Sequence, residues 1–565
     1  MKTRSETWKD LKERESCPVL IVGGGVVGAG LFRELALQGI EALLVDKSDF
    51  SAGCSAAPSR MIHGGWRYLE FGESKLVQQS VTERNLLLRN APHYVTPLPT
   101  TVPVMSWFSG LGHTIGKKLG LKIKRPAYRG ALMVKIGLTV YDIMSSKTRV
   151  MPRHSFASRA GSIARRSLLN PDVKCTATYY DAAISYPERL VLELLMDGEE
   201  ACAGANALSY VSLQGNSSGM VSLRDELSGE VLQVKPTAVV NATGPWIDSA
   251  NRLLGHETSM IGGTKGAHLV LDNPELVEQL GDGMIFYETP DGRVSITYAW
   301  LGKALIGSTD IRVDDPDEAR CDDEEIDYML NAIRVPFPKL HVDRSQILSY
   351  FSGVRPLASS KAAQTGAVSR AHQCPVIQPT DDVPFPVYPM IGGKWTPFRD
   401  FSEHVADTIL AQLATTRRAS TRELAIGGGK QFPGDEDARR TWLAQLGDST
   451  GLDESCLSLL LYRYGTSAQR VAEFITAEPD KSLENHAKYS QREIEFIVRN
   501  ERVFHLTDLV LRRTSIALLG ELTRPLLDEL AAITGAVLGW SQEETQADIE
   551  RTIAILADKF GVNLS

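Results

Sequence analysis

Pro18-Val-Leu-Ile-Val-Gly23-Gly-Gly25-Val-Val-Gly28 is the most informative part of this sequence. Residues 18–23 indicate a short buried strand, because they are apolar, rich in β-branched side chains and end in glycine. Residues 29–38 have the pattern of a helix, with Gly39 just past its end. Glu41-Ala-Leu-Leu-Val-Asp46 then indicates a second apolar strand that ends in an acid. This order predicts the start of a parallel sheet buried on both faces.

The glycine turn between the first strand and the helix predicts a dinucleotide site. Gly23, Gly25 and Gly28 would allow a tight turn, close approach of the backbone to a pyrophosphate, and close packing of helix on strand. The helix N-terminus would face the phosphates with its unpaired N–H groups. Asp46 stands where a carboxylate accepts hydrogen bonds from ribose hydroxyls, which disfavours NADP. The motif alone does not separate FAD from NAD.

Length and composition set wider limits. A chain of 565 residues is expected to form two or three domains. With 43% hydrophobic and 23% charged residues it has the composition of a globular protein, and a net charge of -8 gives no indication of a nucleic-acid partner. We expect no transmembrane helix and no secretion signal. The seven scattered cysteines favour reduced thiols in the cytoplasm over disulfides or a zinc site.

The sequence pattern changes along the chain from one that predicts strands to one that predicts helices. Four further strands, which suit a second, mixed sheet, are expected at 237–241, 267–271, 294–298 and 304–307. A linker is expected after about residue 415, so that a domain at 1–415 precedes a helical domain at 416–565. Helical periodicity is present near 436–447, 455–463, 466–476, 490–501, 505–511 and 523–558.

One segment is both basic and apolar. No acidic residue lies between Glu83 and Asp142. Lysines, arginines and apolar residues alternate there, notably Lys117, Lys118, Lys122, Lys124, Arg125, Arg129 and Lys135, with Trp107, Phe108, Leu119, Leu121, Ile123 and Leu132. This combination is typical of a segment that lies on an anionic membrane surface. An ordinary solvated basic loop is the alternative.

Several motifs resemble those of the FAD-dependent glycerol-3-phosphate dehydrogenases. The run Ser59-Arg-Met-Ile-His63-Gly-Gly-Trp-Arg67-Tyr-Leu-Glu70 resembles the family's "SKLIHGGLRYLE" signature. The others, in the family's order, are Glu83 to His93, Asn241-Ala-Thr-Gly-Pro-Trp246, Lys265-Gly-Ala-His268, Gly307-Ser-Thr-Asp310, Ser352-Gly-Val-Arg-Pro-Leu357, Gly392-Gly-Lys394 and Arg512-Arg-Thr-Ser. The resemblance implies an α/β flavoprotein: a Rossmann-type FAD-binding domain interleaved with a mixed-sheet substrate domain, then an all-helical C-terminal domain.

The resemblance also implies a set of site residues. His63 is the expected proton acceptor or hydrogen-bonding orienter. Arg355 is expected to take part in catalysis, and Arg67, Arg355, Arg370 and Lys394 are expected to bind a phosphorylated substrate. Expected contacts to FAD are Gly23, Gly25, Gly28, Asp46, Lys47, Ser55, Ser59, Arg60, His63, Gly64, Gly65, Ala242, Thr243, Gly244, Gly353, Gly392, Gly393, Lys394, Trp395 and Thr396. No metal site is expected.

The chain departs from the family at several positions around this site. Ala56 and Pro58 replace serines, and Trp66 replaces a leucine. Trp395-Thr-Pro-Phe-Arg399 stands in place of "LTTYR", and Tyr186-Pro-Glu-Arg189 in place of "DDAR". We therefore keep two substrates open: glycerol 3-phosphate, and a larger phosphorylated polyol of a specialised pathway.

Three functions remain in competition. A dehydrogenase could pass electrons to a membrane quinone, which the basic and apolar segment favours. A soluble oxidase could reduce oxygen instead. A non-catalytic flavoprotein is the third, since the altered positions could have damaged flavin or substrate contacts. The resemblance also leaves a homodimer open.

Overall fold

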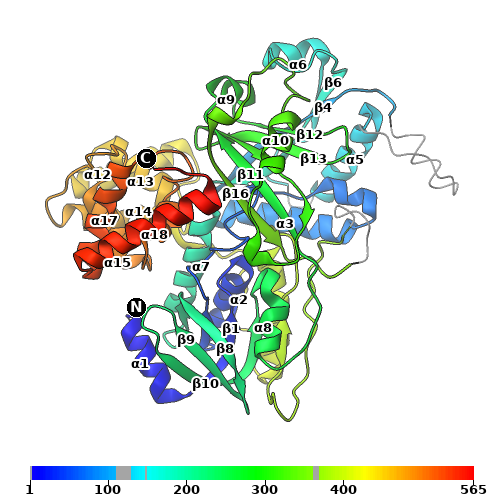
Figure 1. The fold of residues 1–565 in the computed structure, drawn as a ribbon. Helices are drawn as coiled ribbons and strands as arrows, with labels where there is room; N and C mark the ends of the chain where they lie inside the picture. The colour runs from blue at the N-terminus through cyan, green and yellow to red at the C-terminus, as the bar shows by residue number, and fades with distance from the viewer. Residues whose placement is uncertain (1–2, 110–128, 147–148, 361–367, 565) are drawn as a thin grey trace.

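The computed structural model describes residues 3–109, 129–146, 149–360 and 368–564. Figure 1 shows two sheets with a group of helices, orange to red, beside them. The expected fold class, mixed α/β sheets followed by a helical C-terminal domain, is confirmed.

The first sheet carries the glycine turn. Its strands are β1 (Ser16–Val22), β2 (Ala42–Val45), β7 (Asn206–Leu208), β8 (Val211–Ser217), β9 (Met220–Asp225), β10 (Val231–Asn241) and β17 (Val387–Pro389). The order is β7-β2-β1-β10-β9-β8, with β17 also paired to β10. β1 is parallel to both β2 and β10, as the βαβ pattern predicts. Residues 237–241 were expected in the second sheet, but they form the end of β10 in the first sheet, because they pair with β1.

Both faces of β1 are buried. Val19 and Ile21 pack into a core with helices α2 (Val26–Leu37), α7 (Pro187–Ala201) and α11 (Phe398–Gln412). Leu20 and Val22 point to the other face, where Trp8 of α1 (Arg4–Arg14) packs. Because both faces of a central parallel strand are buried, both must be apolar, and Pro18 to Val22 accordingly contains no polar residue.

The second sheet forms the other wall of the site. Its strands are β3 (Met61–Ile62), β4 (Val95–Val104), β5 (Ser155–Ser158), β6 (Cys175–Ile184), β11 (Thr264–Leu271), β12 (Met284–Glu288), β13 (Val294–Trp300), β14 (Lys303–Gly307), β15 (Ile311–Arg312) and β16 (Ile347–Arg355). The order is β15-β11-β14-β13-β12-β4-β6-β3, with β16 paired to β11 and β5 to β6. The predicted strands at 267–271, 294–298 and 304–307 lie in β11, β13 and β14.

Further helices flank the sheets: α3 (Ser74–Asn90), α5 (Ala131–Met144), α6 (Arg159–Arg165), α8 (Ile247–Leu253), α9 (Pro274–Leu280) and α10 (Asp323–Ala332), with short 3₁₀ turns η1 (Trp66–Phe71), η3 (Gly244–Trp246) and η4 (Pro316–Glu318). No helix among the described residues has the length and apolar character needed to cross a membrane.

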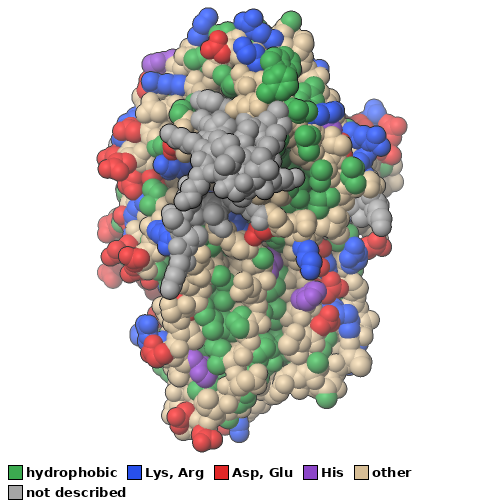
Figure 2. Space-filling view, turned by 90° about the vertical axis from the view of Figure 1, so that its right-hand side faces the viewer, with side chains coloured by type: hydrophobic (Ala, Val, Ile, Leu, Met, Phe, Trp, Pro, Cys, Tyr) green, Lys and Arg blue, Asp and Glu red, His purple; other side chains and the backbone are tan. Residues whose placement is uncertain are grey.

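Helix α5 has two apolar faces. Val134, Leu138 and Tyr141 are buried against the body of the protein. The opposite face leaves four large apolar side chains exposed: Leu132, Ile136, Val140 and Ile143. Trp107 and Phe108 are also exposed, and the backbone of Trp107 bonds to the start of α5. Hydrophobic side chains gather on the side of the molecule drawn in Figure 2. The basic cluster from Lys117 to Arg125 lies outside the described residues.

The C-terminal helices are α12 (Glu436–Thr450), α13 (Glu454–Tyr464), α14 (Ala468–Thr476), α15 (Gln491–Asn500), α16 (Leu506–Asp508), a π turn η9 (Leu509–Arg513), α17 (Arg524–Leu538) and α18 (Gln542–Phe560). The predicted single segment at 523–558 is in fact two helices. Gly539 ends α17 in the left-handed conformation, and Ser541 starts α18 with a capping box.

The helical domain is joined to both sheets. Trp300 and Phe351 of the second sheet share a core with Ile497 and Leu530 of the helical domain. Arg189 of α7, which matches the arginine of the family's DDAR, forms a buried ion pair with Glu501 at 2.7 Å. These contacts hold the helical domain against the second sheet and against α7, which packs on the first sheet.

Candidate active site

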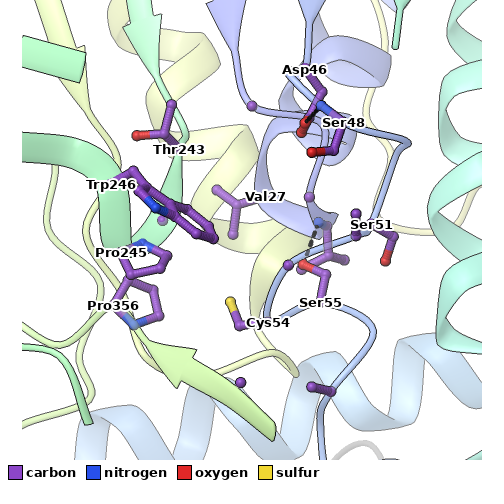
Figure 3. A pocket seen from close by; sticks show the side chains of 18 of the residues that line it. Val27, Asp46, Ser48, Ser51, Cys54, Ser55, Thr243, Pro245, Trp246 and Pro356 are labelled. Carbon is purple, nitrogen blue, oxygen red and sulfur yellow. Dashed lines mark hydrogen bonds between the residues drawn. The ribbon is translucent and has the colours of Figure 1, made fainter. Parts of the chain in front are cut away.

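One cavity, of about 720 Å³, lies where the carboxyl ends of the parallel strands meet the second sheet. Residues that directly follow β1, β2 and β10 line it, namely Gly23, Asp46 and Ala242. Figure 3 shows Asp46 and Ser48 on one side of this cavity and Thr243 and Trp246 on the other. Its volume falls within the range of roughly 300–1,000 Å³ that small-molecule and cofactor sites have.

The glycine turn has the geometry that the motif predicts. Gly23 has a φ of +113°, and a Cβ there would lie 2.5 Å from the Ala242 carbonyl oxygen. A Cβ on Gly28 would collide with the Gly23 carbonyl oxygen. Gly25 is the N-cap of α2, so the N-terminus of this helix opens into the cavity. Unpaired N–H groups at such a terminus favour a bound anion.

Asp46 lines the cavity beside this helix terminus. Its carboxylate accepts hydrogen bonds from the backbone N–H of Gly24 at 2.7 Å and of Ser48 at 2.9 Å. Burial raises the pKa of Asp46 to about 6, although these two N–H groups act in the opposite direction. At neutral pH Asp46 is therefore an ionised acceptor.

Three side chains from separate elements of the first domain meet in the lining of the cavity. The Lys47 ammonium lies 4.5 Å from the centre of the Trp246 ring and 3.4 Å from Asp317. The Trp246 indole N–H donates to Asp317 at 3.0 Å. These three side chains bring β2, η3 and η4 together at the dinucleotide end.

His63 lies at the other end of the cavity. Its backbone N–H donates to the Thr396 hydroxyl at 3.1 Å, and the same hydroxyl donates to the His63 carbonyl oxygen at 3.3 Å. Burial, and then the charges of Lys394 and Arg370, lower the pKa of His63 well below its ordinary value. The imidazole is therefore neutral at physiological pH and able to accept a proton.

Three cationic side chains line the cavity at the same end. Arg355 donates to Asp310 at 3.1 Å and to the Ser308 hydroxyl at 3.2 Å. Arg370 lies 4.0 Å from the same Asp310 carboxylate. Burial lowers the pKa of Lys394 to about 7. With one carboxylate among these cations, the end of the cavity that contains His63 suits an anion.

Most of the predicted site residues are brought together by this cavity. Those that line it are Gly23, Gly25, Asp46, Lys47, Ser55, Ser59, His63, Ala242, Thr243, Gly244, Gly353, Arg355, Arg370, Gly392, Gly393, Lys394, Trp395 and Thr396. Those that do not are Gly28, Arg60, Gly64, Gly65 and Arg67. Gly28, Gly64 and Gly65 lie one layer behind the wall, where each allows close packing of the backbone.

Arg60 and Arg67 have other surroundings. The Arg60 guanidinium is fully buried, donates to Glu188 at 2.7 Å and lies 4.1 Å from the centre of the Trp300 ring. We therefore leave Arg60 out of the proposed cofactor contacts. Burial and the nearby Arg129 lower the pKa of Arg67 to about 10. Arg67 stays a candidate substrate residue through its proximity to Tyr68 and Arg370.

Other residues that line the cavity were not predicted. Tyr68 and His268 belong to motifs quoted above, so their positions within those motifs were an available signal. His268 bonds to the Ser59 hydroxyl at 2.8 Å. The helical domain contributes Arg512, which also belongs to a motif quoted above. It further contributes Arg551, Ile555, Lys559 and Phe560, for which no local pattern in the sequence was a signal.

Two of the departures from the family lie away from the cavity. Trp66 is buried against Tyr179 and Phe286, and Gly137 of α5 packs on its ring. Phe398 is buried in the core with α2. Among the altered residues, Pro58 and Trp395 do line the cavity. Part of the wall is therefore altered, whereas Ala56, Trp66 and Phe398 do not line it.

A glycine turn at a parallel-sheet edge, leading to a neutral histidine among three cationic side chains, defines a dinucleotide-dependent oxidoreductase. Comparisons with known proteins agree. Residues 18–382 match the family described as FAD dependent oxidoreductase, and residues 419–545 match the C-terminal domain of alpha-glycerophosphate oxidase.

Individual proteins are similar over almost the whole chain. A glycerol-3-phosphate dehydrogenase of Synechocystis sp. is 30% identical, over 94% of this chain and 95% of that protein. The aerobic glycerol-3-phosphate dehydrogenase of Bacillus subtilis is 27% identical, over 89% and 87%. The crystal structure of the glycerol-3-phosphate dehydrogenase from Bacillus halodurans complexed with FAD shares the fold, with a TM-score of 0.75 and 21% identity over 98% of this chain and 97% of that one.

The chain belongs to the FAD-dependent oxidoreductases and, within them, to the glycerol-3-phosphate dehydrogenase family. Its cofactor is FAD, and the cavity fits this group. Gly353 and Gly393 line the cavity at points where a Cβ would collide with Ala57 and Leu357, so that larger residues would distort this wall. Two buried polar atoms of the lining, the Ser51 hydroxyl oxygen and Trp395 Nε1, have no hydrogen-bond partner among the described residues. Such atoms are expected to bond to a ligand.

Proposed function

We propose that this protein oxidises the secondary alcohol of sn-glycerol 3-phosphate, or a close analogue, to the ketone, and passes the electrons to a quinone. The observation that carries the proposal is the presence of a neutral His63 beside Arg355, Arg370 and Lys394 at one end of the FAD cavity. A base alone would suit many alcohols, but three cations in the same cavity favour a substrate with a phosphate group; Lys394 is buried, and Arg355 and Arg370 are partly buried.

Each residue has a distinct part in the proposed reaction. His63 accepts the hydroxyl proton, and Thr396 holds its backbone. Arg355 and Arg370 bind phosphate oxygens, with Asp310 orienting both guanidinium groups. Lys394 adds a point charge. FAD supplies the acceptor for the hydride of the alcohol carbon. The alcohol thus loses one proton and one hydride and becomes a ketone.

Glycerol 3-phosphate is the first candidate substrate because two departures from the family, Trp66 and Phe398, are packed in cores and do not line the cavity. The larger polyol phosphate remains the second candidate, since Pro58 and Trp395, which differ from the family, line the cavity. Steady-state assays with a series of polyol phosphates and their unphosphorylated counterparts test this choice. A higher kcat/KM for the unphosphorylated alcohols would overturn the proposal, and a preference for a longer phosphate ester would select the second candidate.

The electron acceptor is the finer part of the proposal. The exposed apolar face of α5 and the exposed Trp107 and Phe108 support docking on a membrane, where quinones dissolve. The basic composition of the surrounding sequence supports an anionic lipid surface. Binding to vesicles of anionic lipid, measured by co-sedimentation, is expected to fall when Ile136 and Ile143 are both replaced by Asp.

A matched control distinguishes this surface from exposed apolar residues in general. Leu227 and Val231 are exposed in a different part of the first domain, so L227D/V231D should bind vesicles like the unaltered protein. Oxygen consumption without added quinone, faster than turnover with a quinone analogue, would instead identify a soluble oxidase. Failure of anaerobic substrate to bleach the flavin absorbance would identify a non-catalytic flavoprotein.

A further inference from the structure

Three polar side chains form a buried cluster directly behind the His63 loop. They are Arg84 of α3, Tyr141 of α5 and Asp181 of β6, and at most 3% of any of them is exposed. The Tyr141 hydroxyl donates to Asp181 at 2.6 Å. Arg84 donates to the Asp181 carboxylate at 2.9 Å and to the Tyr141 oxygen at 2.7 Å. None of the three lines the cavity, so the cluster acts on the site through other residues.

The cluster holds the residue that follows His63. The Gly64 N–H donates to both the Tyr141 oxygen, at 3.1 Å, and Asp181, at 3.0 Å. On its other side, the Gly64 carbonyl oxygen accepts a hydrogen bond from Lys394 Nζ at 3.1 Å. A Cβ on Gly64 would collide with the Tyr141 side chain. The backbone at Gly64, directly after the proposed base, is therefore fixed between this cluster and Lys394, a residue proposed to bind the phosphate.

The same cluster sets the charge around Lys394. Burial, above all, lowers the pKa of Lys394, and Arg370 and Arg84 lower it further. The carboxylates of Asp181 and Glu73 raise it, and Asp181 has the larger influence. The Tyr68 ring lies 5.0 Å from Lys394 Nζ. The ionisable groups that face Lys394 are thus His63, Tyr68, Glu73, Arg84, Asp181 and Arg370.

We propose that Tyr141 and Asp181 are positioning residues for this reaction: Tyr141 and Asp181 together hold Gly64, and so His63, in place, and Asp181 keeps Lys394 cationic for binding the substrate phosphate. The part that concerns phosphate rests on the proposed function. Removing the Asp181 charge would deprive two buried cations, Arg84 and Lys394, of a negative charge that stabilises them. Since Arg84 is a guanidinium that stays protonated, Lys394 is the group that would lose its proton.

The first test replaces Asp181 with Asn, which keeps an oxygen for the Gly64 N–H but removes the charge. The measurement is the affinity for inorganic phosphate, followed through the flavin absorbance spectrum and as a competitive inhibition constant, from pH 6 to pH 9. Because Asp181 raises the pKa of Lys394 towards its value of about 7, its loss should weaken phosphate binding by up to about tenfold at pH 8 but by less than about twofold at pH 6. The KM for the substrate follows the same pattern, with kcat changed by less.

The second variant is Tyr141→Phe, which keeps every charge and nearly the same shape. It loosens Gly64, so kcat is expected to fall about three- to tenfold, the loss of one weakened hydrogen bond, while the pH dependence of phosphate binding stays unchanged. The two variants therefore separate positioning of the base from the charge of Lys394. If the role is purely structural, both variants should have a lower melting temperature, without a selective change in kcat for Y141F or in the pH dependence of phosphate binding for D181N.

Glu493→Gln is the matched control. Glu493 accepts from Tyr464 and from Arg463, both at 2.8 Å, so it forms the same kind of buried Tyr–carboxylate–Arg cluster, but in the helical domain. Its phosphate affinity and kcat should equal those of the unaltered enzyme.

The outcomes distinguish this inference from the proposed function. If the unaltered enzyme neither binds phosphate nor oxidises a phosphorylated polyol, the proposed function fails. If it does both and D181N has the same phosphate affinity across the pH range, the inference alone is overturned. Should D181N fail to retain FAD, the decision passes to Y141F, for which an unchanged kcat would overturn the inference.

Discussion

Arg513 of the helical domain donates to both carboxylate oxygens of Asp49, at 2.7 and 2.8 Å, and both side chains are buried. Asp49 lies just after Asp46 in the loop that lines the cofactor cavity. Arg512 also pairs with Asp49 and lines the cavity itself. The helical domain is therefore attached directly to the dinucleotide site.

Replacing Asp49 with Asn is expected to destabilise the protein at neutral pH. Burial acts to raise the pKa of Asp49, but Arg513 and Arg512 hold it below its ordinary value. A carboxylate with a depressed folded-state pKa stabilises the fold above its unfolded pKa, and this contribution is lost as the pH falls through the folded value. Leaving the two guanidinium groups without it should cost about 3–5 kcal/mol, measured by denaturant unfolding at pH 7.

The comparison variant for Asp49→Asn is Glu230→Gln. Glu230 pairs with Lys12 at the surface, where an ion pair contributes little. Its free energy of unfolding should stay close to that of the unaltered protein. The destabilisation of D49N should shrink in acid; an equal difference at pH 7 and at pH 3 would show that the charge of Asp49 is not its cause.

Replacing Gly28 with Ala should abolish FAD retention. The added Cβ would meet the Gly23 carbonyl oxygen and force the turn away from the N-terminus of α2. The measurement is the ratio of flavin to protein absorbance after gel filtration. Gly434→Ala is the control, because a Cβ at Gly434 meets open space. Full flavin content in G28A would contradict the tight packing of this turn.

Replacing His63 with Asn should lower kcat about 10²–10⁴-fold with a much smaller change in KM, as for loss of a general base. Since the pKa of His63 is depressed, the imidazole is neutral at physiological pH, and its protonation should reduce kcat only well below pH 6.5. His341→Asn, at an exposed position, should leave both constants unchanged. An acid limb of kcat centred at pH 6.5 or above would be inconsistent with the buried setting of His63.

Replacing Arg355 with Ala should weaken binding of phosphorylated substrates by about 2 kcal/mol or more, which is roughly 30-fold. Binding of unphosphorylated analogues should change far less, because the guanidinium addresses the phosphate. The affinities can be measured by flavin difference spectra under anaerobic conditions. Arg344→Ala removes an exposed arginine that pairs with Asp327, and it should behave as the unaltered enzyme. An unchanged affinity in R355A would remove Arg355 from the phosphate site.

Short-range patterns accounted for the dinucleotide half of the site. Gly23, Gly25, Gly28 and Asp46 follow each other along one strand, turn and helix, so their spacing already restricts their geometry. Motifs elsewhere in the chain pointed to His63, Arg355 and Lys394, and these residues line the same cavity. Local patterns did not predict to which sheet residues 237–241 belong, because this depends on the partner strand. They also missed that Gly539 ends one helix within the segment at 523–558.

Only the tertiary structure decided which side chains face the cavity. Trp66 and Arg60 lie within motifs of the site, yet one packs in a core and the other pairs with Glu188. Arg513 and Asp49 form an ion pair although they belong to opposite ends of the chain. Tyr141 and Asp181 form a hydrogen bond although one belongs to a helix and the other to a strand, which have different periodicities. The sequence by itself determined the fold class, the cofactor motif and the candidate base, because neighbours along the chain set these. The tertiary structure decided the partners of each buried charge, because such pairs form between elements whose approach no local pattern describes.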